Sequence, residues 1–453
     1  MSLTRYADYK DSGLEWLGKV PGHWEVKRLR FVAELNPSKS EIANLDKEMP
    51  ISFLPMDAIG DDGTLNLERE KSIAEVETGY TYFRDGDVTV AKITPCFENG
   101  KGAVMRGLTQ GIGFGTTELI VARPIASRTC SDYLHVLFIS GEFRKNGEGH
   151  MYGAGGQKRV PDDFVRNFAI AFPPIEEQQT IAAFLDRETG KIDALIAEQR
   201  RLVELLAEKR QAVISHAVTK GLNPNARMKD SGIEWLGEVP EHWEVKRVRF
   251  VAELNPSKSE VATMDKEILV SFLPMDAIGD DGKLNLEREK PIAEVETGYT
   301  FFRDGDVTVA KITPCFENGK GAVMRGLTQG IGFGTTELIV ARPIASQTSS
   351  DYLHSLFTSV VFRKNGEGHM YGAGGQKRVP DDFVRNFEIA FPPIEEQQAI
   401  ATFLNTEIAK FDTLTAEANR AIELLQERRS ALISAAVTGK IDVRNLSLKQ
   451  EAA

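Results

Sequence analysis

The sequence predicts an α+β protein, in which two mixed α/β globular domains are joined by two long helices that pair antiparallel as a coiled coil. Three observations predict this fold. The 453-residue chain repeats itself with a period of 219 residues, which implies pseudo-twofold symmetry. The first part of each copy places turn signals between short β-prone runs. The second part carries apolar residues at helical spacing and contains no glycine-rich loop.

The repeat sets the domain organisation. A shift of 219 residues aligns Trp16 with Trp235 and Pro173 with Pro392 without an insertion or deletion, and only four positions differ between residues 51–124 and their second copy. Solenoid repeats run to about 20 to 50 residues, so this period indicates a duplicated pair of domains. The predicted segments are globular domains at 1–172 and 221–391, helical segments at 173–220 and 392–440, and a tail at 441–453.

Each globular domain is predicted from its turns. The stretches NPSKS, GDDG, FENGKG and YGAGG separate β-rich runs such as DVTVAKI and ELIVARP. Glycine, proline and asparagine end strands because they favour backbone conformations that a strand cannot continue. The pattern predicts a mixed α/β domain with protruding loops.

Each helical segment has a clear beginning and end. Pro173-Pro174, followed by two glutamates, suits a helix N-terminus, and Gly221 suits its C-terminus. A helix of about 43 residues would be roughly 65 Å long at 1.5 Å rise per residue. Gly190 interrupts the first helix and costs about 1 kcal/mol there, which leaves a kink or break open.

Each helix carries a stripe of apolar residues along one face, called its rail. Antiparallel pairing is predicted, so that the rail of each helix covers the rail of the other. The alternative is that each helix packs on a partner protein, and both arrangements can hold on different faces. The residues predicted for helix pairing or partner docking are Ile181, Leu185, Ile192, Leu195, Leu202 and Leu206 in the first copy and Ile400, Leu404, Phe411, Leu414, Leu425 and Leu432 in the second.

Composition excludes several classes of protein. The chain is 42% hydrophobic and 27% charged, and it lacks an apolar run near the roughly 20 residues that span a bilayer. The start, MSLTRYADYKDSG, lacks the apolar stretch of a signal peptide. Three cysteines without a CxxC pair argue against a disulfide framework and a zinc site. We therefore expect a soluble, cytoplasmic protein without a membrane partner.

A search for catalytic motifs finds none. FENGKG lacks the first glycine and the Ser/Thr of a P-loop, and neither GIGFG nor GAGG fits a GxGxxG frame. FPPI lacks the polar acceptor and the aromatic ring of the amino-methyltransferase motif, and none of the seven histidines has metal-ligand spacing. The sequence predicts no catalytic residue, no metal and no cofactor in this chain.

Local charge is uneven along each globular domain, which leaves nucleic-acid binding open. The net charge of −11 argues against it, but residues 41–91 hold 4 Lys/Arg and 12 Asp/Glu, whereas residues 92–166 hold 10 and 7. The basic half contains two loop blocks, 92–107 and 143–160, which combine Lys and Arg with Asn, Gln and aromatic residues. The alternative is that both blocks are solvated turns.

Candidate DNA contacts follow from the residue types in these blocks. Phosphate contacts are predicted for Lys92, Lys101, Lys158 and Arg159, and contacts to base edges or a stacked wedge for Asn99, Tyr152 and Gln157. The corresponding residues of the second copy are Lys311, Lys320, Lys377, Arg378, Asn318, Tyr371 and Gln376.

Three stretches together resemble a known family. A domain ending in NFAIAFPPIEEQQTIAAFLD, a helix closing on ISHAVTKGL, and a second domain opening with KDSGIEWLGEVPEHWEVKRVRF resemble the specificity subunit of a type I restriction-modification system. The resemblance covers essentially the whole chain. It implies two target-recognition domains, each reading half of a split site on double-stranded DNA, and helical spacers that dock two modification (methyltransferase) subunits.

The resemblance also implies which chemistry lies elsewhere. Adenine methylation and ATP-dependent cleavage would belong to the modification subunits and to restriction (motor and nuclease) subunits, so that S-adenosylmethionine, ATP and Mg would bind the partners. The specificity subunit would be non-catalytic, in agreement with the search for motifs.

This chain departs from the family in one respect. Family members usually carry two different recognition domains, whereas these two are nearly identical, so the sequence predicts an interrupted palindrome as the DNA site. Substitutions between the copies cluster at 127–142, outside both loop blocks: Arg128/Gln347, Cys130/Ser349, Val136/Ser355, Ile139/Thr358 and Glu142/Val361.

Two other functions remain open on the sequence. A self-sufficient DNA methyltransferase or nuclease would need a cofactor or metal motif, and none is found. A coiled-coil adaptor without a role on DNA is compatible with the long helices alone.

Overall fold

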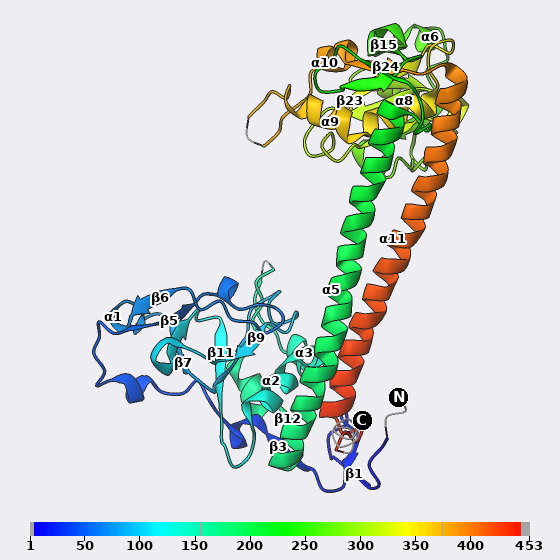
Figure 1. Cartoon of the computed structure of the whole chain (residues 1–453). Helices are drawn as coiled ribbons and strands as arrows, with labels where there is room; N and C mark the ends of the chain where they lie inside the picture. Colours follow the sequence, from blue (N-terminus) through cyan, green and yellow to red (C-terminus); the bar gives the residue numbers. More distant parts are fainter. Residues whose placement is uncertain (1–3, 155, 374, 445–453) are drawn as a thin grey trace. The chain divides into compact units, whose positions relative to one another are not determined.

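The computed structural model describes residues 4–154, 156–373 and 375–444, which form two compact units (Figure 1). Unit 1 comprises residues up to 199 together with those from 420 onwards, and unit 2 comprises residues 200–419. Each unit therefore contains one globular domain, the beginning of the long helix that follows it and the end of the other long helix.

The domain of unit 1 is built on two four-stranded sheets, with strand orders β6-β5-β10-β7 and β4-β11-β8-β9. Its strands are β1 (Tyr9–Asp11), β2 (Lys19–Pro21), β3 (Glu25–Arg28), β4 (Ala33–Leu35), β5 (Pro50–Leu54), β6 (Glu70–Ser72), β7 (Thr81–Arg84), β8 (Val88–Ala91), β9 (Gly102–Val104), β10 (Ile112–Gly115), β11 (Leu119–Pro124) and β12 (Ala169–Phe172).

The domain of unit 2 repeats this plan, with strand orders β18-β17-β22-β19 and β16-β23-β20-β21. Its strands are β13 (Met228–Asp230), β14 (Glu238–Pro240), β15 (Glu244–Arg247), β16 (Ala252–Leu254), β17 (Leu269–Leu273), β18 (Glu289–Pro291), β19 (Thr300–Arg303), β20 (Val307–Ala310), β21 (Gly321–Val323), β22 (Ile331–Gly334), β23 (Leu338–Pro343) and β24 (Glu388–Phe391).

Short helices connect the strands and cover the sheets. The α-helices are α1 (Ile73–Val76), α2 (Ser131–Ile139), α3 (Gly141–Glu148), α4 (Asp162–Asn167), α5 (Ile175–Lys220), α6 (Ser259–Ala262), α7 (Ile292–Val295), α8 (Ser350–Thr358), α9 (Val360–Glu367), α10 (Asp381–Asn386) and α11 (Ile394–Val437). The 3-10 helices are η1 (Leu29–Phe31), η2 (Lys39–Ile42), η3 (Met56–Ala58), η4 (Thr109–Gly111), η5 (Val248–Phe250), η6 (Met275–Ala277) and η7 (Thr328–Gly330).

The register of the sheets follows from the residues of their central strands. β8 reads VTVA and is buried throughout, because it pairs antiparallel with both β9 and β11. β10 pairs parallel with β5 and antiparallel with β7, so the other sheet is mixed. Strands buried on both faces read as continuous apolar runs, as in the DVTVAKI and ELIVARP stretches. The predicted mixed α/β domains are thus confirmed.

The two long helices are also confirmed. α5 contains 46 residues and begins directly after Pro173-Pro174, and α11 contains 44 residues and begins after the second Pro-Pro pair. α5 runs through Gly190 as one helix, so the break that this glycine left open does not occur. Gly221 follows the last turn with φ of +74°, a conformation that glycine adopts without steric cost and that ends the helix.

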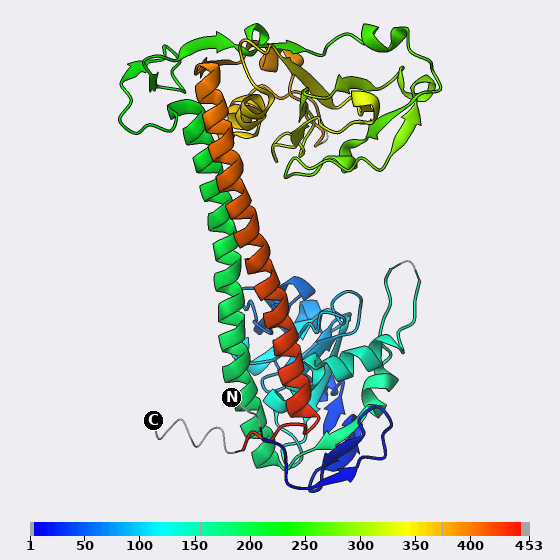
Figure 2. The same ribbon diagram turned by 90° about the vertical axis from the view of Figure 1, so that its right-hand side faces the viewer.

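Within each unit the helices run antiparallel (Figure 2). In unit 1, Leu185 near the beginning of α5 shares a core with Val437 at the end of α11. In unit 2, Val218 at the end of α5 shares a core with Leu404 near the beginning of α11. One ion pair crosses between the helices in each unit: Arg429–Asp193 at 2.9 Å in unit 1 and Arg210–Asp412 at 3.0 Å in unit 2. The predicted pairing is therefore present in both.

The helix seam differs from the predicted rail at three positions. Leu195, Leu202 and Leu414 are 46%, 41% and 46% exposed. In a helix of 3.6 residues per turn, either i+3 or i+4 can continue a stripe, and here the seam takes the next residue instead, as with Ile196, which is 7% exposed. These three leucines do not pair the helices and remain candidates for partner docking.

The other predicted rail residues lie in the seam or in the adjoining cores. Seven are buried (Ile181, Leu185, Ile192, Leu206, Ile400, Leu404 and Phe411), and two are half-buried (Leu425 and Leu432).

The PPIEEQ stretch is the junction between each domain and its helix. The fully buried Gln178 accepts hydrogen bonds from Thr129 Oγ1 at 2.8 Å and from Cys130 N at 3.3 Å, and it donates to the carbonyl of Pro173 at 2.9 Å. Gln397 makes the same set of contacts in unit 2. Buried polar groups that are fully bonded fix geometry, so the first turn of each helix is locked to its own domain.

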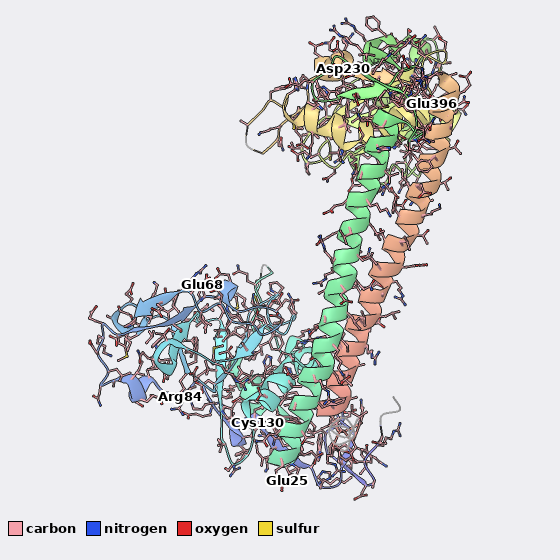
Figure 3. All side chains as sticks on the ribbon, viewed as in Figure 1. Glu25, Glu68, Arg84, Cys130, Asp230 and Glu396 are labelled. Carbon is pink, nitrogen blue, oxygen red and sulfur yellow. The ribbon has the colours of Figure 1, made fainter. Side chains whose placement is uncertain are left out.

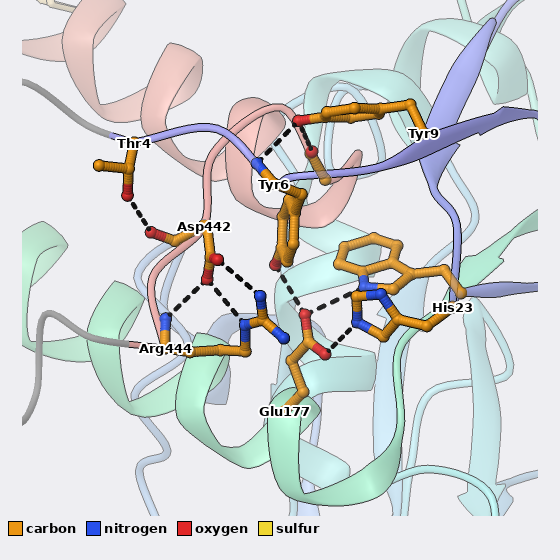
Figure 4. A network of polar contacts seen from close by, with 9 residues as sticks. Thr4, Tyr6, Tyr9, His23, Glu177, Asp442 and Arg444 are labelled. Atoms are coloured by element: carbon orange, nitrogen blue, oxygen red, sulfur yellow. Dashed lines mark hydrogen bonds and ion pairs between the residues drawn. The ribbon is translucent and has the colours of Figure 1, made fainter.

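In unit 1 the N-terminal segment is held by the end of the chain (Figure 4). Tyr6 donates to Glu177 Oε1 at 2.7 Å, and Asp442 N donates to the carbonyl of Thr4 at 2.8 Å. Arg444 donates to both carboxylate oxygens of Asp442, at 2.9 and 2.7 Å, and its guanidinium lies 5.0 Å from the ring centre of Tyr6. We call this set of five residues the terminal clasp. In unit 2 the corresponding place is taken by the peptide chain that links α5 to β13.

Acid is expected to weaken the terminal clasp. Hydrogen bonds from Arg444 lower the pKa of Asp442. A carboxylate with a lowered folded pKa stabilises the protein above its unfolded value of about 3.9, and this contribution disappears as pH falls through the folded value. Asp442→Asn should therefore lower the free energy of unfolding at pH 6 by up to about 1 kcal/mol. Urea unfolding at pH 6 and pH 3 measures it: the difference between the two proteins should be larger at pH 6 than at pH 3. An equal difference at both pH values would contradict the role of this carboxylate.

Candidate nucleic-acid interface

The two loop blocks come together in each domain. Tyr152 and Arg159 pair as the base of a narrow loop, with backbone bonds of 3.0 and 2.9 Å. The segment 92–95 runs beside this loop, because Val160 N donates to the carbonyl of Lys92 at 2.8 Å. The loop projects from the domain in both views of the fold (Figures 1 and 2). The two blocks are separated in the sequence, but they form one continuous surface in the structure.

We call this surface the loop surface. In unit 1 it consists of the described residues 92–99, 152–154 and 156–160. In unit 2 it consists of 311–318, 371–373 and 375–379.

Four of the predicted contact residues are exposed on the loop surface. Tyr152 is 61% exposed and Tyr371 is 60% exposed. Asn99, Gln157 and Lys158 are also exposed, as are their second-copy equivalents. Within the described residues, no ion pair reaches the ammonium group of Lys158. An aromatic ring, two amides and an uncompensated ammonium group can reach a ligand here without first breaking a contact within the protein.

The other three predicted residues have partners within the protein. Arg159 donates to both oxygens of Glu118 at 2.7 to 3.1 Å, and these bonds raise the pKa of its guanidinium. The Nζ atom of Lys92 lies 3.9 Å from Oδ1 of Asp162, and Nζ of Lys101 lies 3.6 Å from Oδ1 of Asp61. Arg378, Lys311 and Lys320 repeat these pairs in unit 2. Contacts from these residues to phosphate stay predictions. A phosphate would have to share each of these side chains with the carboxylate that it already contacts.

Part of the second loop block is not a loop. Residues 143–148 belong to α3, whose N-cap Ser140 accepts a hydrogen bond from Phe143 N. Phe143 and Phe97 are buried, and their ring centres lie 5.7 Å apart. Apolar rings so placed serve the core, so stacking on bases is left to Tyr152. The sequence missed this because FRKNGEG contains glycine and polar residues that are also typical of turns.

Sequence reasoning missed two residues that shape the loop surface. Glu118 accepts from Arg159 through its side chain, while its backbone carbonyl accepts from Lys92 N at 2.8 Å. Thr94 lies in the first segment of the surface, and its hydroxyl bonds to Gly156 and Lys158 of the neighbouring loop. Both residues flank a predicted strand and carry no charge pattern or spacing that marks them, so no sequence signal would have selected them.

The acidic half of the domain contains a buried ion pair. Asp87 is 1% exposed and accepts from Arg123 Nε and Nη2, both at 2.8 Å, and from Arg84 N at 2.9 Å. Glu41 accepts from the remaining nitrogen of Arg123 at 2.5 Å. The same bidentate pair is present between Asp306 and Arg342, whose pKa the Asp306 hydrogen bonds raise. Both the Asp87 and the Glu41 carboxylates are therefore paired with Arg123 within the domain.

The cluster of differences between the copies at 127–142 lies beside the long helices, away from the loop surface. Glu142 accepts a hydrogen bond from Ser434 of α11, and Cys130 N donates to Gln178 of α5. Figure 3 shows Cys130 close to the foot of α5, whereas Glu68 and Arg84 lie in the outer part of the domain. The residues of the loop surface are identical in the two copies. Within this cluster, the divergence therefore changes contacts between a domain and the long helices of its unit.

The described residues form neither a metal cluster nor a membrane-spanning helix. Among the residues that the structure describes, no cluster of three or more His, Cys, Asp or Glu side chains is arranged to hold a metal ion. Across the same residues, no helix combines the length and the apolar character needed to cross a membrane.

The fold and the loop surface together define a class of protein. It is a duplicated two-domain scaffold that carries the same basic loop twice, together with two long helices that pair antiparallel within each unit. The sequence matches the family model described as "Type I restriction modification DNA specificity domain" over residues 21–205 and 299–424. The chain belongs to the family of type I restriction-modification specificity subunits, which are non-catalytic.

Named relatives agree with this assignment. The chain is 36% identical over 260 residues to the type I restriction enzyme EcoAI specificity subunit of Escherichia coli, covering 57% of this chain and 42% of that protein. It is 41% identical over 201 residues to the EcoEI specificity subunit of the same organism, covering 44% of this chain and 33% of that protein. The chain thus spans less than half the length of these two relatives.

Solved structures share the fold. The HsdS subunit from Thermoanaerobacter tengcongensis matches with a TM-score of 0.55 at 18% identity, covering 93% of this chain and 98% of that one. A chain from a structure on complex assembly and conformational transition of the type I R-M system matches with a TM-score of 0.67 at 18% identity, covering 92% and 98%. The predicted fold class and family are confirmed.

Proposed function

We propose that the chain is the DNA-reading subunit of a type I restriction-modification complex, and that it binds a bipartite, interrupted-palindromic site through its two loop surfaces. The observation that carries this proposal is the exposed, identical loop surface in both domains, with Tyr152, Gln157 and Lys158 available for contact. Two equal readers imply two equal half-sites. The relatives, whose names mark them as specificity subunits of restriction enzymes, support the assignment to DNA.

The proposal includes the partners of the chain. Two modification subunits would dock on the helices and methylate adenine, and restriction subunits would add ATP-dependent cleavage. The exposed leucines Leu195, Leu202 and Leu414 are candidates for this docking, because apolar side chains on a long helix favour burial against another protein. S-adenosylmethionine, ATP and Mg would bind to those partners, and the complex would act in the cytoplasm.

Removing the lysine at each loop tip tests the proposal. The double variant Lys158→Ala and Lys377→Ala should bind all duplexes more weakly, and the slope of log K against log salt should become shallower by about one for each phosphate that a lysine no longer neutralises. Fluorescence anisotropy across a salt series, on the full chain with modification subunits bound, measures both quantities. Lys283→Ala is a matched control, since that lysine is also exposed but lies in the acidic half of its domain.

The same experiment separates the competing functions. If the chain were a coiled-coil adaptor, the globular domains would not determine which DNA sequence the complex prefers. An unchanged salt slope in the double variant, with specific binding intact, would place the DNA contact outside the loop tips.

A further inference from the structure

One hydroxyl group holds the tip of each projecting loop in place. Thr94 Oγ1 donates to the carbonyl of Gly156 at 2.7 Å and accepts from Lys158 N at 3.0 Å, while Thr94 N donates to the carbonyl of Lys158 at 2.9 Å. Unit 2 repeats these contacts: Thr313 Oγ1 donates to Gly375 at 2.8 Å and accepts from Lys377 N at 3.1 Å. The hydroxyl therefore spans the last turn of the loop in both copies.

The loop tip has little else to fix it. Gly153, Ala154, Gly156 and Gln157 are exposed, and no side chain of the described tip residues enters a hydrophobic core. Gly153 has φ of +127°, and a Cβ there would lie 2.6 Å from the carbonyl oxygen of Gln157, so the backbone approaches itself closely at this point. A narrow, glycine-rich, solvated loop of this kind loses much conformational entropy when it is ordered.

The base of the loop is fixed separately from its tip. Arg159 is held by the carboxylate of Glu118 and by its backbone pair with Tyr152. These contacts set where the loop leaves the domain, but they do not reach Gly156 or Gln157. Only the threonine hydroxyl, within the described residues, joins the tip to the rest of the loop surface through a side chain.

We propose that Thr94 and Thr313 are positioning residues for DNA recognition: they hold the loop tips in the conformation that contacts DNA, so that binding does not have to order them. This rests on the proposed function. Groups that are ordered before binding retain affinity that would otherwise be lost to conformational entropy. The threonines need not touch DNA, because their hydroxyls are already used by Gly156 and Lys158 and by the equivalent pair in unit 2.

Replacing threonine by valine removes the hydroxyl but keeps the shape of the side chain. The double variant Thr94→Val and Thr313→Val should bind its specific duplex on the order of tenfold more weakly, from the loss of two hydrogen bonds in each copy. Its salt slope should match that of the wild type, because no charge changes. Its melting temperature should also stay close to that of the wild type, because the freed backbone groups at the tip can bond to water.

Two further variants separate positioning from a merely structural role. Thr94→Ser with Thr313→Ser keeps the hydroxyl and should restore affinity. Thr109→Val with Thr328→Val is the matched control: it removes a hydroxyl that lies outside the loop surface and donates to Glu70 at 2.7 Å and, in the second copy, to Glu289 at 2.6 Å. The control should bind DNA as the wild type does.

The experiment uses the full chain with modification subunits bound, and it measures anisotropy on a duplex carrying the methylated motif and on a scrambled duplex. Hydrogen exchange measures how well the amides of 156–158 are protected. The equivalent peptides of the two copies have the same sequence and are measured as one signal, which is sufficient because both copies carry the change. The inference is overturned if these amides exchange faster in the valine variant while specific affinity is unchanged, or if the serine variant binds as weakly as the valine variant. If the wild type itself does not distinguish the two duplexes, the proposed function fails instead.

Discussion

Methylated adenines in the genome that carries this system should lie in a motif whose two halves are inverse complements, separated by a spacer of about half a turn to a full turn of DNA. The expectation follows from the identity of the loop surfaces, since two equal readers imply two equal half-sites. Single-molecule methylome sequencing reads the motif directly. A motif whose halves are unrelated would show that residues outside the loop surface read the bases.

Binding measurements on altered half-sites make the same expectation quantitative. Each mismatched base pair typically costs about 1 to 3 kcal/mol, so scrambling a half-site of three or four pairs should lower affinity by about a thousandfold or more. Scrambling the left half and scrambling the right half should give the same loss. The replacement of Arg128 by Gln347 in the second copy alters a charge outside both loop blocks, and it should leave this equality intact.

Asp87→Ala should strongly destabilise the domain of unit 1. The carboxylate is buried and binds Arg123 through two hydrogen bonds, so its removal leaves a guanidinium that is 14% exposed and short of its main partner. Breaking a buried ion pair by removing one partner costs about 3 to 5 kcal/mol. Hydrogen exchange should show loss of protection in the first domain. Peptides from 127–142 report on this domain alone, because the sequences of the two copies differ there.

The chain provides a matched control for this substitution. Asp57 forms an ion pair with Arg69 at 2.9 Å, but the two side chains are 65% and 57% exposed. Exposed pairs contribute about 0 to 1 kcal/mol, so Asp57→Ala should leave exchange in the domain nearly unchanged. If both substitutions had the same effect, burial would not explain the role of Asp87.

The long-range architecture was predictable because it depends on repetition and periodicity. The repeat, the two helices beginning at Pro-Pro and their antiparallel pairing all follow from spacing along the chain. The choice between Leu195 and Ile196 for the seam did not follow, because both residues continue a helical stripe, and spacing alone does not say which of them is covered.

The candidate site was predictable in composition but only partly in geometry. Gln157 and Lys158 were selected by residue type and are exposed, whereas Arg159 has the same charge as Lys158 and is held by Glu118. Which basic residue is free depends on strand pairing that brings residue 118 beside 159, and one sequence does not reveal that. Thr94 was missed for the same reason, since its role exists only when two distant segments meet.

The terminal clasp has a consequence for how the protein is made. During vectorial synthesis on the ribosome, unit 2 is complete once residue 419 has emerged, because it contains only residues 200–419. Unit 1 starts first but must wait for the last turns of α11 and for Asp442 and Arg444, which hold Thr4 and Tyr6. The domain that is translated first is therefore the last to be completed. Until the last turns of α11 have been synthesised, the part of its core that they cover stays exposed.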